Sequence, residues 1–296
     1  GGIVDEQALY DALVAGQVAG AGVDVYSKEP CTDSPLFTLD NVVATPHLGA
    51  STDEAQEKAG VAVAKSVRQA LAGELVPDAV NVEGGNIEEA VRPFIELTER
   101  VGRIASTLAP SPIAAVDVQV LGEAATADVR VLQLSALKGV FSVLVEDPVS
   151  YVNAPVLAAD RGVETSLTTD GESPEHRTLV RVKLALTDGR SVAVAGTVAG
   201  PRDIEKLVEI DGFEIDVPIS EHMAFYTYDD KPGIVGVVGQ SLGSADVNIA
   251  GMQVSRTKAG GEALIALTVD SAIPSPTLDE IASKIGAAAV HAVDLD

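Results

Sequence analysis

The pattern of hydrophobic residues changes twice along this chain of 296 residues, so no single sheet or helical bundle can account for it. The first region alternates short apolar runs with helical periodicity, which is typical of a parallel α/β sheet. The middle region carries period-2 patterns joined by turn residues, and the last region mixes both patterns. We therefore predict a multi-domain chain that combines α/β and α+β architecture.

Short strands are predicted in the first region at residues 19–25 and 41–45, where small and β-branched residues cluster. Ahead of them, Asp5 can cap a helix whose apolar residues recur at helical spacing. The alternation of helix and strand predicts that the two strands lie parallel in one sheet.

A long helix is predicted to begin at Ser51, because Ser51 and Glu54 have the spacing of a capping box. Gly73 is expected to end it. Every fourth residue is apolar, which predicts one buried face. These residues are Ala55, Ala59, Val63, Val67 and Leu71.

Turn-forming residues at Pro77–Asn86 indicate a linker that crosses to a separate α+β domain at residues 80–218. The predicted elements of this domain are helices at 88–108 and 128–141, a strand at 116–120, and two hairpins that turn at Thr187–Arg190 and Asp211–Gly212.

The last region has the order β-α-β-β-α-β, which is the ferredoxin-like split unit. Strands are predicted at 222–228, 247–256, 262–269 and 290–295, with helices at 234–242 and 277–285. Pro232 stands where a helix commonly begins.

Charge and cysteine content exclude several classes of protein. The chain has 44 Asp and Glu residues against 20 Lys and Arg, so its surface repels phosphate backbones and nucleic acid is not an expected partner. The single cysteine, Cys31, excludes an internal disulfide framework and a multi-cysteine zinc site, and we expect no metal. No apolar run reaches about 18 residues, so we expect no membrane partner and a cytoplasmic location.

Two polar residues follow the predicted strands of the first region: Glu29 and His47. A histidine with a pKa near neutrality can carry a proton to or from a hydroxyl group, and a neighbouring carboxylate stabilises its charged form. The carboxyl ends of parallel strands are where α/β sheets bind ligands. Spacing alone leaves open a structural histidine and a solvated loop carboxylate.

Longer segments carry more information. GGIVDEQAL, AGVDVYSKEP and VVATPHLGAST, in this order, resemble the D-2-hydroxyacid dehydrogenase family. EAQEKAGVAVAKSV, PDAVNV and VSYVNAPVLAADRGV resemble the long, multi-domain D-3-phosphoglycerate dehydrogenases within that family. The resemblance extends over essentially the whole chain.

The resemblance implies four regions. Residues 1–48 would be the C-terminal remnant of an NAD-binding, Rossmann-like domain, and residues 49–79 a helix and linker that return to the substrate domain. Residues 80–218 would be an intervening domain and residues 219–296 an ACT regulatory domain.

The implied activity is the NAD-dependent oxidation of 3-phospho-D-glycerate to 3-phosphohydroxypyruvate, in L-serine biosynthesis. His47 would exchange a proton with the C2 oxygen of the substrate, with Glu29 as its partner carboxylate. Asp24 would contact the nicotinamide part of NAD, together with the backbone of His47, Leu48, Gly49 and Ala50.

Two parts of that machinery are missing from the sequence. In the family an arginine that anchors the substrate stands directly before the segment that matches Gly1–Gly2, and no G-x-G-x-x-G follows a predicted strand here. We therefore expect this chain to be the C-terminal part of a longer protein and to be inactive alone.

The segment from Tyr228 to Gly233, followed by Asp246 to Ile249, resembles an ACT domain. The implied effector is L-serine, bound between two subunits of a homo-oligomer that is a dimer or a tetramer. Backbone N–H groups at a helix start can hold its carboxylate and Asp230 its ammonium. The implied contacts are Tyr228, Asp230, Lys231, Pro232, Gly233, Asn248 and Ile249.

Alternatives remain at this point. The chain could be a stand-alone amino-acid-binding regulatory module, or part of a dehydrogenase of another 2-hydroxyacid. Relatives sometimes carry an anion site in the intervening domain, which needs clustered cations. Lys206 is present here, but Asp211, Glu214 and Asp216 crowd the nearby hairpin, which argues against that anion site.

Overall fold

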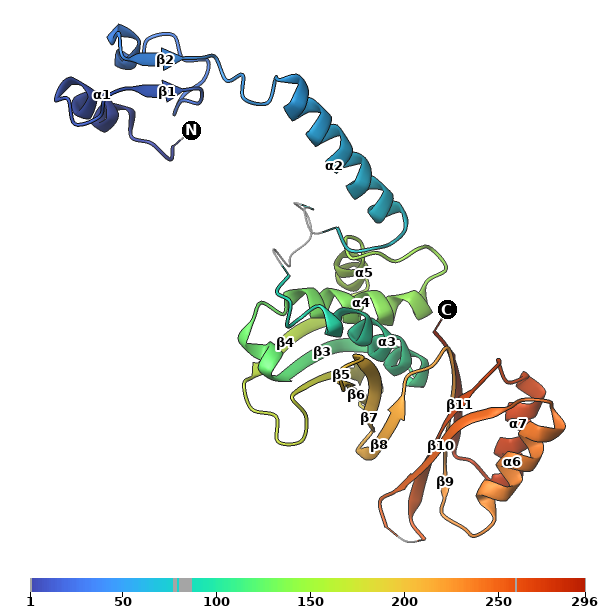
Figure 1. The fold of residues 1–296 in the computed structure, drawn as a ribbon. Coiled ribbons are helices and arrows are strands. Elements are labelled where there is room, and N and C mark those ends of the chain that lie inside the picture. Colours follow the sequence, from blue (N-terminus) through green and yellow to red (C-terminus); the bar gives the residue numbers. More distant parts are fainter. Residues whose placement is uncertain (1, 77–78, 80–86, 259, 296) are drawn as a thin grey trace. The chain divides into compact units, whose positions relative to one another are not determined.

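The computed structural model describes residues 2–76, 79, 87–258 and 260–295. These residues form two compact units, which meet in the sequence between Gln69 and Ala70. Each unit is described by itself below, with the element labels of Figure 1. The predicted linker at Pro77–Asn86 lies outside the described residues, except for Ala79.

The first unit contains a two-stranded parallel sheet, so the predicted pairing of its strands is confirmed. Val23 pairs with Ala44 at the last position of both strands, which places the loops that follow them at the same edge of the sheet. The elements are α1 (Glu6–Val14), β1 (Ala21–Val23), the 3-10 helix η1 (Pro35–Thr38), β2 (Val42–Ala44) and α2 (Asp53–Leu71). The predicted cap is also confirmed, because Asp5 Oδ1 accepts a hydrogen bond from Ala8 N at 2.9 Å.

The predicted capping box of the long helix is wrong. Helix α2 begins at Asp53, two residues after Ser51, and its cap is Thr52, whose Oγ1 accepts a hydrogen bond from Ala55 N at 3.2 Å. This register moves Glu54 to the second helical position, from which it cannot complete a capping box with Ser51.

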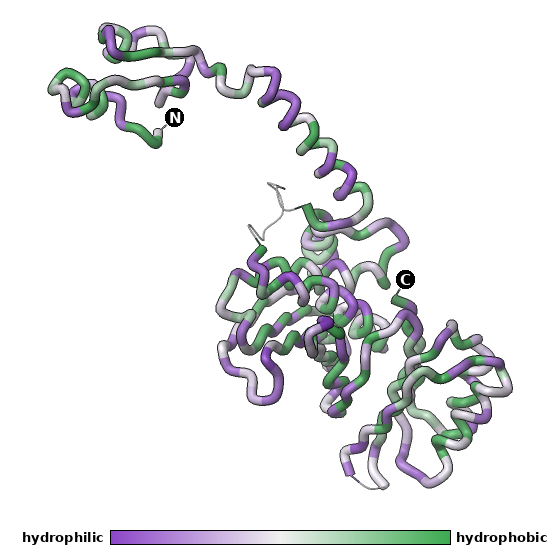
Figure 2. Tube along the Cα trace, viewed as in Figure 1, coloured by the Kyte–Doolittle hydropathy of each residue, from purple (hydrophilic) through white to green (hydrophobic). Residues whose placement is uncertain are grey.

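The predicted buried face of α2 is not buried in this structure. No side chain of the helix is buried, and Val61, Val63, Val67 and Leu71 are exposed. Hydrophobic and hydrophilic residues alternate along α2 in Figure 2, so the periodicity is real. The reason for the difference is that no other helix or strand described in the first unit packs closely against α2.

The larger unit contains a six-stranded sheet in the order β4-β3-β5-β6-β7-β8, in which every neighbouring pair is antiparallel except β3 and β4. Helices α3 and α4 pack together on one face of this sheet (Figure 1). The elements are α3 (Pro93–Leu108), β3 (Ile113–Gly122), the 3-10 helix η2 (Glu123–Thr126), α4 (Arg130–Leu144), α5 (Ala154–Asp160), β4 (Glu164–Asp170), β5 (Thr178–Leu186), β6 (Ser191–Ala199), β7 (Ile204–Ile210) and β8 (Phe213–Pro218). Both predicted hairpins are confirmed.

Two glycines allow α3 and α4 to approach closely. A Cβ atom on Gly102 would lie 2.5 Å from the carbonyl oxygen of Ala136, and one on Gly139 would collide with the carbonyl oxygen of Glu99. Lys138 Nζ also lies 2.9 Å from Glu99 Oε2 across the same contact. The helix pair therefore depends on the absence of side chains at two positions.

The predicted boundaries of these helices shift, and one strand was missed. Helix α3 begins at Pro93 rather than residue 88, because Pro93 is well suited to the first turn. Strand β4 was not predicted, because all but one of its residues are exposed and they show no apolar alternation.

The same unit contains a second sheet of four antiparallel strands in the order β10-β11-β9-β12. Helices α6 and α7 cover one face of it (Figure 1). The elements are β9 (His222–Asp229), α6 (Ile234–Ser244), β10 (Ile249–Arg256), β11 (Glu262–Val269), α7 (Ser275–Ile285) and β12 (Ala289–Asp294), in the predicted order β-α-β-β-α-β.

The two sheets of the larger unit share one hydrophobic core. The face of the four-stranded sheet away from α6 and α7 contributes to the core of the six-stranded sheet, through Met223, Phe225, Leu264, Ala266 and Val293. These side chains are almost completely buried. Among the described residues, no helix has both the length and the apolar character needed to cross a membrane.

Candidate active site

His47 and Glu29 meet at the edge of the parallel sheet where β1 and β2 both end. His47 Nδ1 lies 2.7 Å from Glu29 Oε2. The two side chains are 54% and 32% exposed, so a small molecule can reach the imidazole from solvent. The structure therefore brings together the two residues that were predicted to act together.

The carboxylate of Glu29 is held by two donors. Its Oε1 accepts a hydrogen bond from Tyr26 N at 2.8 Å, while Oε2 faces His47. Tyr26 is itself buried, and its hydroxyl donates to Val23 O at 3.1 Å. The Tyr26 N–H and then the hydrogen bond with His47 lower the pKa of Glu29 below its usual value, so this group stays ionised near neutral pH.

Asp24 holds the loop that carries His47. Its Oδ1 accepts hydrogen bonds from Thr45 Oγ1 at 2.5 Å and from Leu48 N at 2.7 Å, and its Oδ2 accepts one from Gly49 N at 2.8 Å. These donors, led by the Thr45 hydroxyl, lower the pKa of Asp24. Its predicted contact with NAD remains a prediction, but this positioning role is visible in the structure.

The same loop places His47 in a backbone conformation with φ of 59°. A residue other than glycine adopts this left-handed region only when its surroundings enforce it. The bonds from Asp24 to Leu48 N and Gly49 N supply that constraint directly after His47.

Sequence reasoning missed a second positioning carboxylate, Glu6. Its Oε1 accepts hydrogen bonds from Ser27 N and Ser27 Oγ, both at 2.7 Å, and its Oε2 lies 3.4 Å from Ser34 Oγ. The Ser27 N–H is the main cause of its lowered pKa. Glu6 thereby anchors the loop that presents Glu29, through contacts across more than 20 residues of sequence that no local pattern could reveal.

This geometry can perform acid–base chemistry on an oxygen atom. Because ionised Glu29 accepts at Oε2, Nδ1 of His47 is assigned as the donor, which leaves Nε2 free to accept a proton. A proton arriving at Nε2 creates an imidazolium that the adjacent carboxylate stabilises. The arrangement is that of a positioned general base that becomes a general acid in the reverse direction.

The described residues fit one end of a dinucleotide. Leu48, Gly49 and Ala50 are exposed beside His47, so their edge is accessible to a flat ring such as nicotinamide. The N–H groups of Leu48 and Gly49 are already used by Asp24, and the sequence offers no G-x-G-x-x-G to bind a pyrophosphate. The fit therefore extends to the nicotinamide end of NAD only.

The predicted effector residues fall into two separate groups. At the end of β9, Asp230 Oδ2 lies 3.2 Å from Arg256 Nη1, and Gly233 begins α6 with φ of 91°. Lys231 and Pro232 are exposed in the same loop. Tyr228 differs from the expectation, because its side chain is only 2% exposed and packs in the core under α6.

The second group, Asn248 and Ile249, lies at the other end of the sheet. In the register of the strands, Ile249 pairs with Val269, which pairs with His222, whereas Asp229 pairs with Glu262. Seven residue steps of β9 separate these ends, which corresponds to roughly 20 Å. Within one chain the structure therefore does not bring Asn248 to Asp230.

The remaining predicted cation, Lys206, is paired with an acid. Its Nζ lies 2.8 Å from Asp216 Oδ1, on the neighbouring strand. The expected crowding by acids is confirmed for this residue.

The predicted effector residue Asn248 already has a hydrogen-bond partner, because its Nδ2 donates to Asp270 Oδ2 at 2.7 Å.

The lowered pKa values of Asp24 and Glu29 lead to a prediction about acid stability. A carboxylate whose pKa is lower in the folded state stabilises that state above its unfolded pKa of about 4, and this contribution is lost as pH falls through the folded value. Asp24→Asn should lower the melting temperature of the first unit at pH 7 and reduce its loss of stability below about pH 4. Melting followed by circular dichroism from neutral to acidic pH measures both effects.

The matched control is Asp33→Asn, because Asp33 is an exposed loop carboxylate that has no hydrogen bond or ion pair with its side chain among the described residues. It should melt as the wild-type protein does at every pH. An Asp24→Asn protein that also melts like the wild type would contradict the positioning role of Asp24.

Two family models match the chain. Residues 1–49 match the D-isomer specific 2-hydroxyacid dehydrogenase, NAD binding domain, and residues 90–211 match the D-3-phosphoglycerate dehydrogenase intervening domain. The first match contains Asp24, Glu29 and His47, and the second contains most of the six-stranded sheet.

Curated relatives match along the whole chain. D-3-phosphoglycerate dehydrogenase of Mycobacterium leprae (strain TN) is 47% identical over 295 residues, and that of Mycobacterium tuberculosis (strain ATCC 25618 / H37Rv) is 48% identical over 295 residues. The protein of the same name from Bacillus subtilis (strain 168) is 34% identical over 297 residues. In each case the match covers 100% of this chain and 56% of the relative, so the chain spans little more than half their length. The resemblance predicted from the sequence is confirmed.

Proposed function

Because this chain belongs to the D-3-phosphoglycerate dehydrogenase family, we propose that its first unit supplies the acid–base residues of an NAD-dependent dehydrogenase. The observation that carries this proposal is the 2.7 Å contact between His47 Nδ1 and Glu29 Oε2 at the carboxyl edge of β1 and β2. Ligands bind at this edge of parallel sheets.

In the proposed reaction, His47 Nε2 accepts the proton of the C2 hydroxyl group of 3-phosphoglycerate. NAD, when bound, supplies the acceptor for the hydride that leaves the same carbon, so the product is 3-phosphohydroxypyruvate. Glu29 stabilises the imidazolium and fixes its ring, and Asp24 holds the loop that aims it. In the reverse direction the imidazolium returns the proton to the carbonyl oxygen.

The proposal assigns only part of the active site to this chain. Its sequence contains no G-x-G-x-x-G after a strand, and its match covers 56% of the relatives reported above. We therefore propose that the chain alone does not turn over substrate, and that the phosphate-binding loop is not among its residues.

A chimera tests this function directly. The part of the Mycobacterium tuberculosis relative that this chain does not match is joined to the chain, and the reduction of NAD with 3-phosphoglycerate is measured. The chimera should be active and the chain alone inactive. A folded but inactive chimera would contradict the proposal, and turnover of another 2-hydroxyacid instead of 3-phosphoglycerate would favour the alternative that the chain is part of a dehydrogenase of another 2-hydroxyacid.

We further propose that residues 219–296 form an ACT domain that binds L-serine between two copies of the chain. The support is the β-α-β-β-α-β order, the N-terminus of α6 beside Asp230, and the placement of Asn248 at the opposite end of the sheet. A site that uses both Asp230 and Asn248 must take them from two copies, which requires a homo-oligomer.

Calorimetric titration of the chain with L-serine tests this sensing role. L-Serine should bind, and D-serine and glycine should bind at least about tenfold more weakly, because each loses a hydrogen bond to a charged or amide group. Asp230→Asn and Asn248→Ala should each abolish most of the heat.

The control variant is Asp279→Asn, which removes an exposed carboxylate from α7 in the same sheet domain. It should titrate like the wild type. Equal heats for L-serine, D-serine and glycine would overturn the sensing role without affecting the dehydrogenase proposal, and serine binding by a chain whose chimera stays inactive would favour a stand-alone regulatory module.

A further inference from the structure

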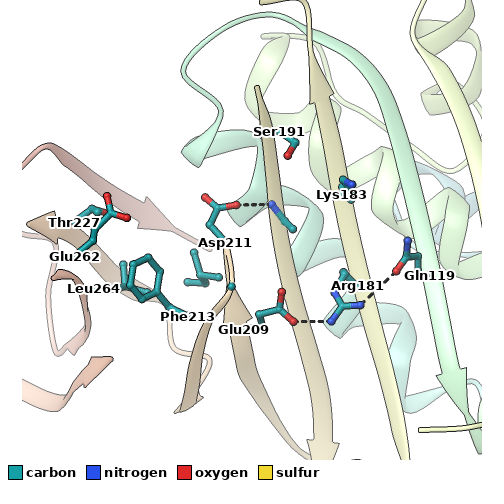
Figure 3. Close-up of a pocket in the computed structure, with 13 residues that line it drawn as sticks. Gln119, Arg181, Lys183, Ser191, Glu209, Asp211, Phe213, Thr227, Glu262 and Leu264 are labelled. Atoms are coloured by element: carbon teal, nitrogen blue, oxygen red, sulfur yellow. Dashed lines mark hydrogen bonds and ion pairs between the residues drawn. The ribbon is translucent and has the colours of Figure 1, made fainter. Parts of the chain in front are cut away.

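A cleft of about 600 Å³ lies where the six-stranded sheet meets the four-stranded sheet. Helices α3 and α4 cover one face of the larger sheet, and β5 directs Val180, Val182 and Leu184 toward that buried face. The intervening residues of β5, Arg181 and Lys183, therefore point to the opposite face, where they line the cleft. Figure 3 shows this wall, with Thr227, Glu262 and Leu264 facing it from the four-stranded sheet.

One end of the cleft is basic. Arg181 is committed to neighbouring side chains, because its Nη2 lies 2.5 Å from Glu209 Oε2 and its Nη1 lies 3.4 Å from Gln119 Oε1 (Figure 3). Lys183 lines the same end, is exposed, and forms no ion pair with any residue of the described chain. Its ammonium is therefore available to an anionic group of a ligand.

The other end of the cleft is acidic. Asp211 stands at the turn between β7 and β8, where its Oδ1 accepts a hydrogen bond from Ala193 N at 2.7 Å, and Glu262 begins β11 across from it. Neither carboxylate forms an ion pair with a described Lys or Arg residue. Thr227 lies on the same side and adds a hydroxyl group.

The wall on the acidic side is apolar. Phe213 and Leu264 lie side by side there in Figure 3, and Ile210 lines the cleft with them. A smaller cavity of about 320 Å³ adjoins this end, and it shares Ser191, Ile210, Asp211, Thr227 and Leu264 with the larger cleft. Phe213, Ile210 and Leu264 are 6%, 3% and 2% exposed, so an aliphatic group bound between the charged ends would contact the small part of these side chains that lines the cleft.

We propose that this cleft binds a zwitterionic α-amino acid with an aliphatic side chain. The carboxylates of Asp211 and Glu262 hold its ammonium, Lys183 holds its carboxylate, and the side chain covers Phe213 and Leu264. Carboxylates at one end and an amine at the other match the separated charges of a zwitterion, and hydrogen bonds between charged groups are stronger than those between neutral ones.

Two other classes of ligand fit the cleft less well. A phosphorylated anion would face Asp211 and Glu262 with like charge, and Glu209 already neutralises Arg181. A metal ion is also disfavoured, because no group of three or more metal-ligating His, Cys, Asp or Glu residues occurs in the described part of the chain. The cleft is separate from the proposed serine site, because neither Asp230 nor Asn248 lines it.

The probe for this site is L-leucine, titrated into the full chain by calorimetry. Two analogues test the two ends separately: 4-methylpentanoate lacks the ammonium, and 3-methylbutylamine lacks the carboxylate. L-Leucine should bind, and each analogue should bind at least about tenfold more weakly, because one charged end is left without a partner.

Two variants identify the cleft as the place of binding. Glu262→Gln and Lys183→Gln should each weaken L-leucine binding about tenfold. Lys183→Gln should leave the binding of 3-methylbutylamine unchanged, because this amine lacks the carboxylate that Lys183 is proposed to hold. Glu172→Gln and Lys65→Gln remove exposed charges of the same kind outside the cleft and should bind L-leucine as the wild type does. Absence of L-leucine binding, or binding that both cleft variants retain in full, would overturn the proposal. Because L-serine binding is proposed at other residues, its presence or absence does not decide this test.

Discussion

Replacing His47 by Asn in the active chimera is expected to reduce kcat by about 10²- to 10⁴-fold, because the hydroxyl proton of the substrate would have no acceptor. Asparagine keeps a polar side chain in the left-handed backbone conformation that His47 adopts, so the loop should stay folded. KM for 3-phosphoglycerate should change little, since the lost interaction develops mainly in the transition state.

Replacing Glu29 by Gln in the same chimera is expected to reduce kcat less than replacing His47 by Asn. Glutamine can still accept from Tyr26 N and His47 Nδ1 through a single oxygen at a time, but it cannot stabilise a charged imidazolium. Its kcat should fall less than that of the His47 variant, because the imidazole is still present to accept the proton but the charge that forms on it has lost its partner carboxylate.

The matched control for this series is His222→Asn. His222 also faces a carboxylate, Asp294, but it lies on β9 in the larger unit. Its kcat should equal that of the unmodified chimera. A His47→Asn chimera that keeps the unmodified kcat would exclude proton transfer by this residue, and equal losses in both variants would indicate a general effect on folding.

Replacing Gly139 by Ala is expected to destabilise the larger unit by about 1–3 kcal/mol, because the added methyl group has no space between α3 and α4. The group would collide with the carbonyl oxygen of Glu99, which belongs to helix backbone and cannot turn aside as a side chain can. The two helices must therefore move apart, which loosens the contact that also contains the ion pair of Lys138 and Glu99.

The control is Gly236→Ala on α6, where a Cβ atom would have no neighbour within 4 Å. Alanine is the better helix former, so this variant should be about 0.5–1 kcal/mol more stable than the wild type. Chemical denaturation followed by circular dichroism measures both variants. The argument about helix contact fails if Gly139→Ala is as stable as Gly236→Ala.

Elements with strong local signals could be predicted from the sequence. The cap at Asp5, the turns at Thr187–Arg190 and Asp211–Gly212, and the β-α-β-β-α-β order all depend on residues close together in the chain. Turn chemistry and hydrophobic period act over a few residues, so tertiary contacts did not override them. This is why the order of elements is confirmed while their boundaries shift.

Elements without a local apolar signal could not be predicted. Strand β4 is exposed and polar, and it belongs to the sheet because its backbone pairs with β3. Helix α2 gave the opposite error, because a real apolar period does not guarantee that another element covers it. Periodicity states what a helix can bury, whereas the tertiary structure decides what it does bury.

The candidate active site shows the same difference between what local sequence signals predict and what only the tertiary structure reveals. The family resemblance implied that His47 and Glu29 act together, whereas the residue types at the ends of the two strands left this open, and the structure places the two side chains in contact. The carboxylates of Glu6 and Asp24, which hold the two loops, act across 21 to 28 residues of sequence and left no local signal. Likewise, only the strand register reveals that Asn248 and Asp230 lie at opposite ends of a sheet.

The core shared by the two sheets of the larger unit limits how this protein can be divided or recombined. Cutting the chain after Pro218 would expose Met223, Phe225 and Leu264 to solvent as a hydrophobic patch, which promotes aggregation. Residues 219–296 are therefore not expected to fold normally when they are separated from the six-stranded sheet. Because the two sheets share one core, a substitution that destabilises the four-stranded sheet should also destabilise the six-stranded sheet, and the two should unfold together.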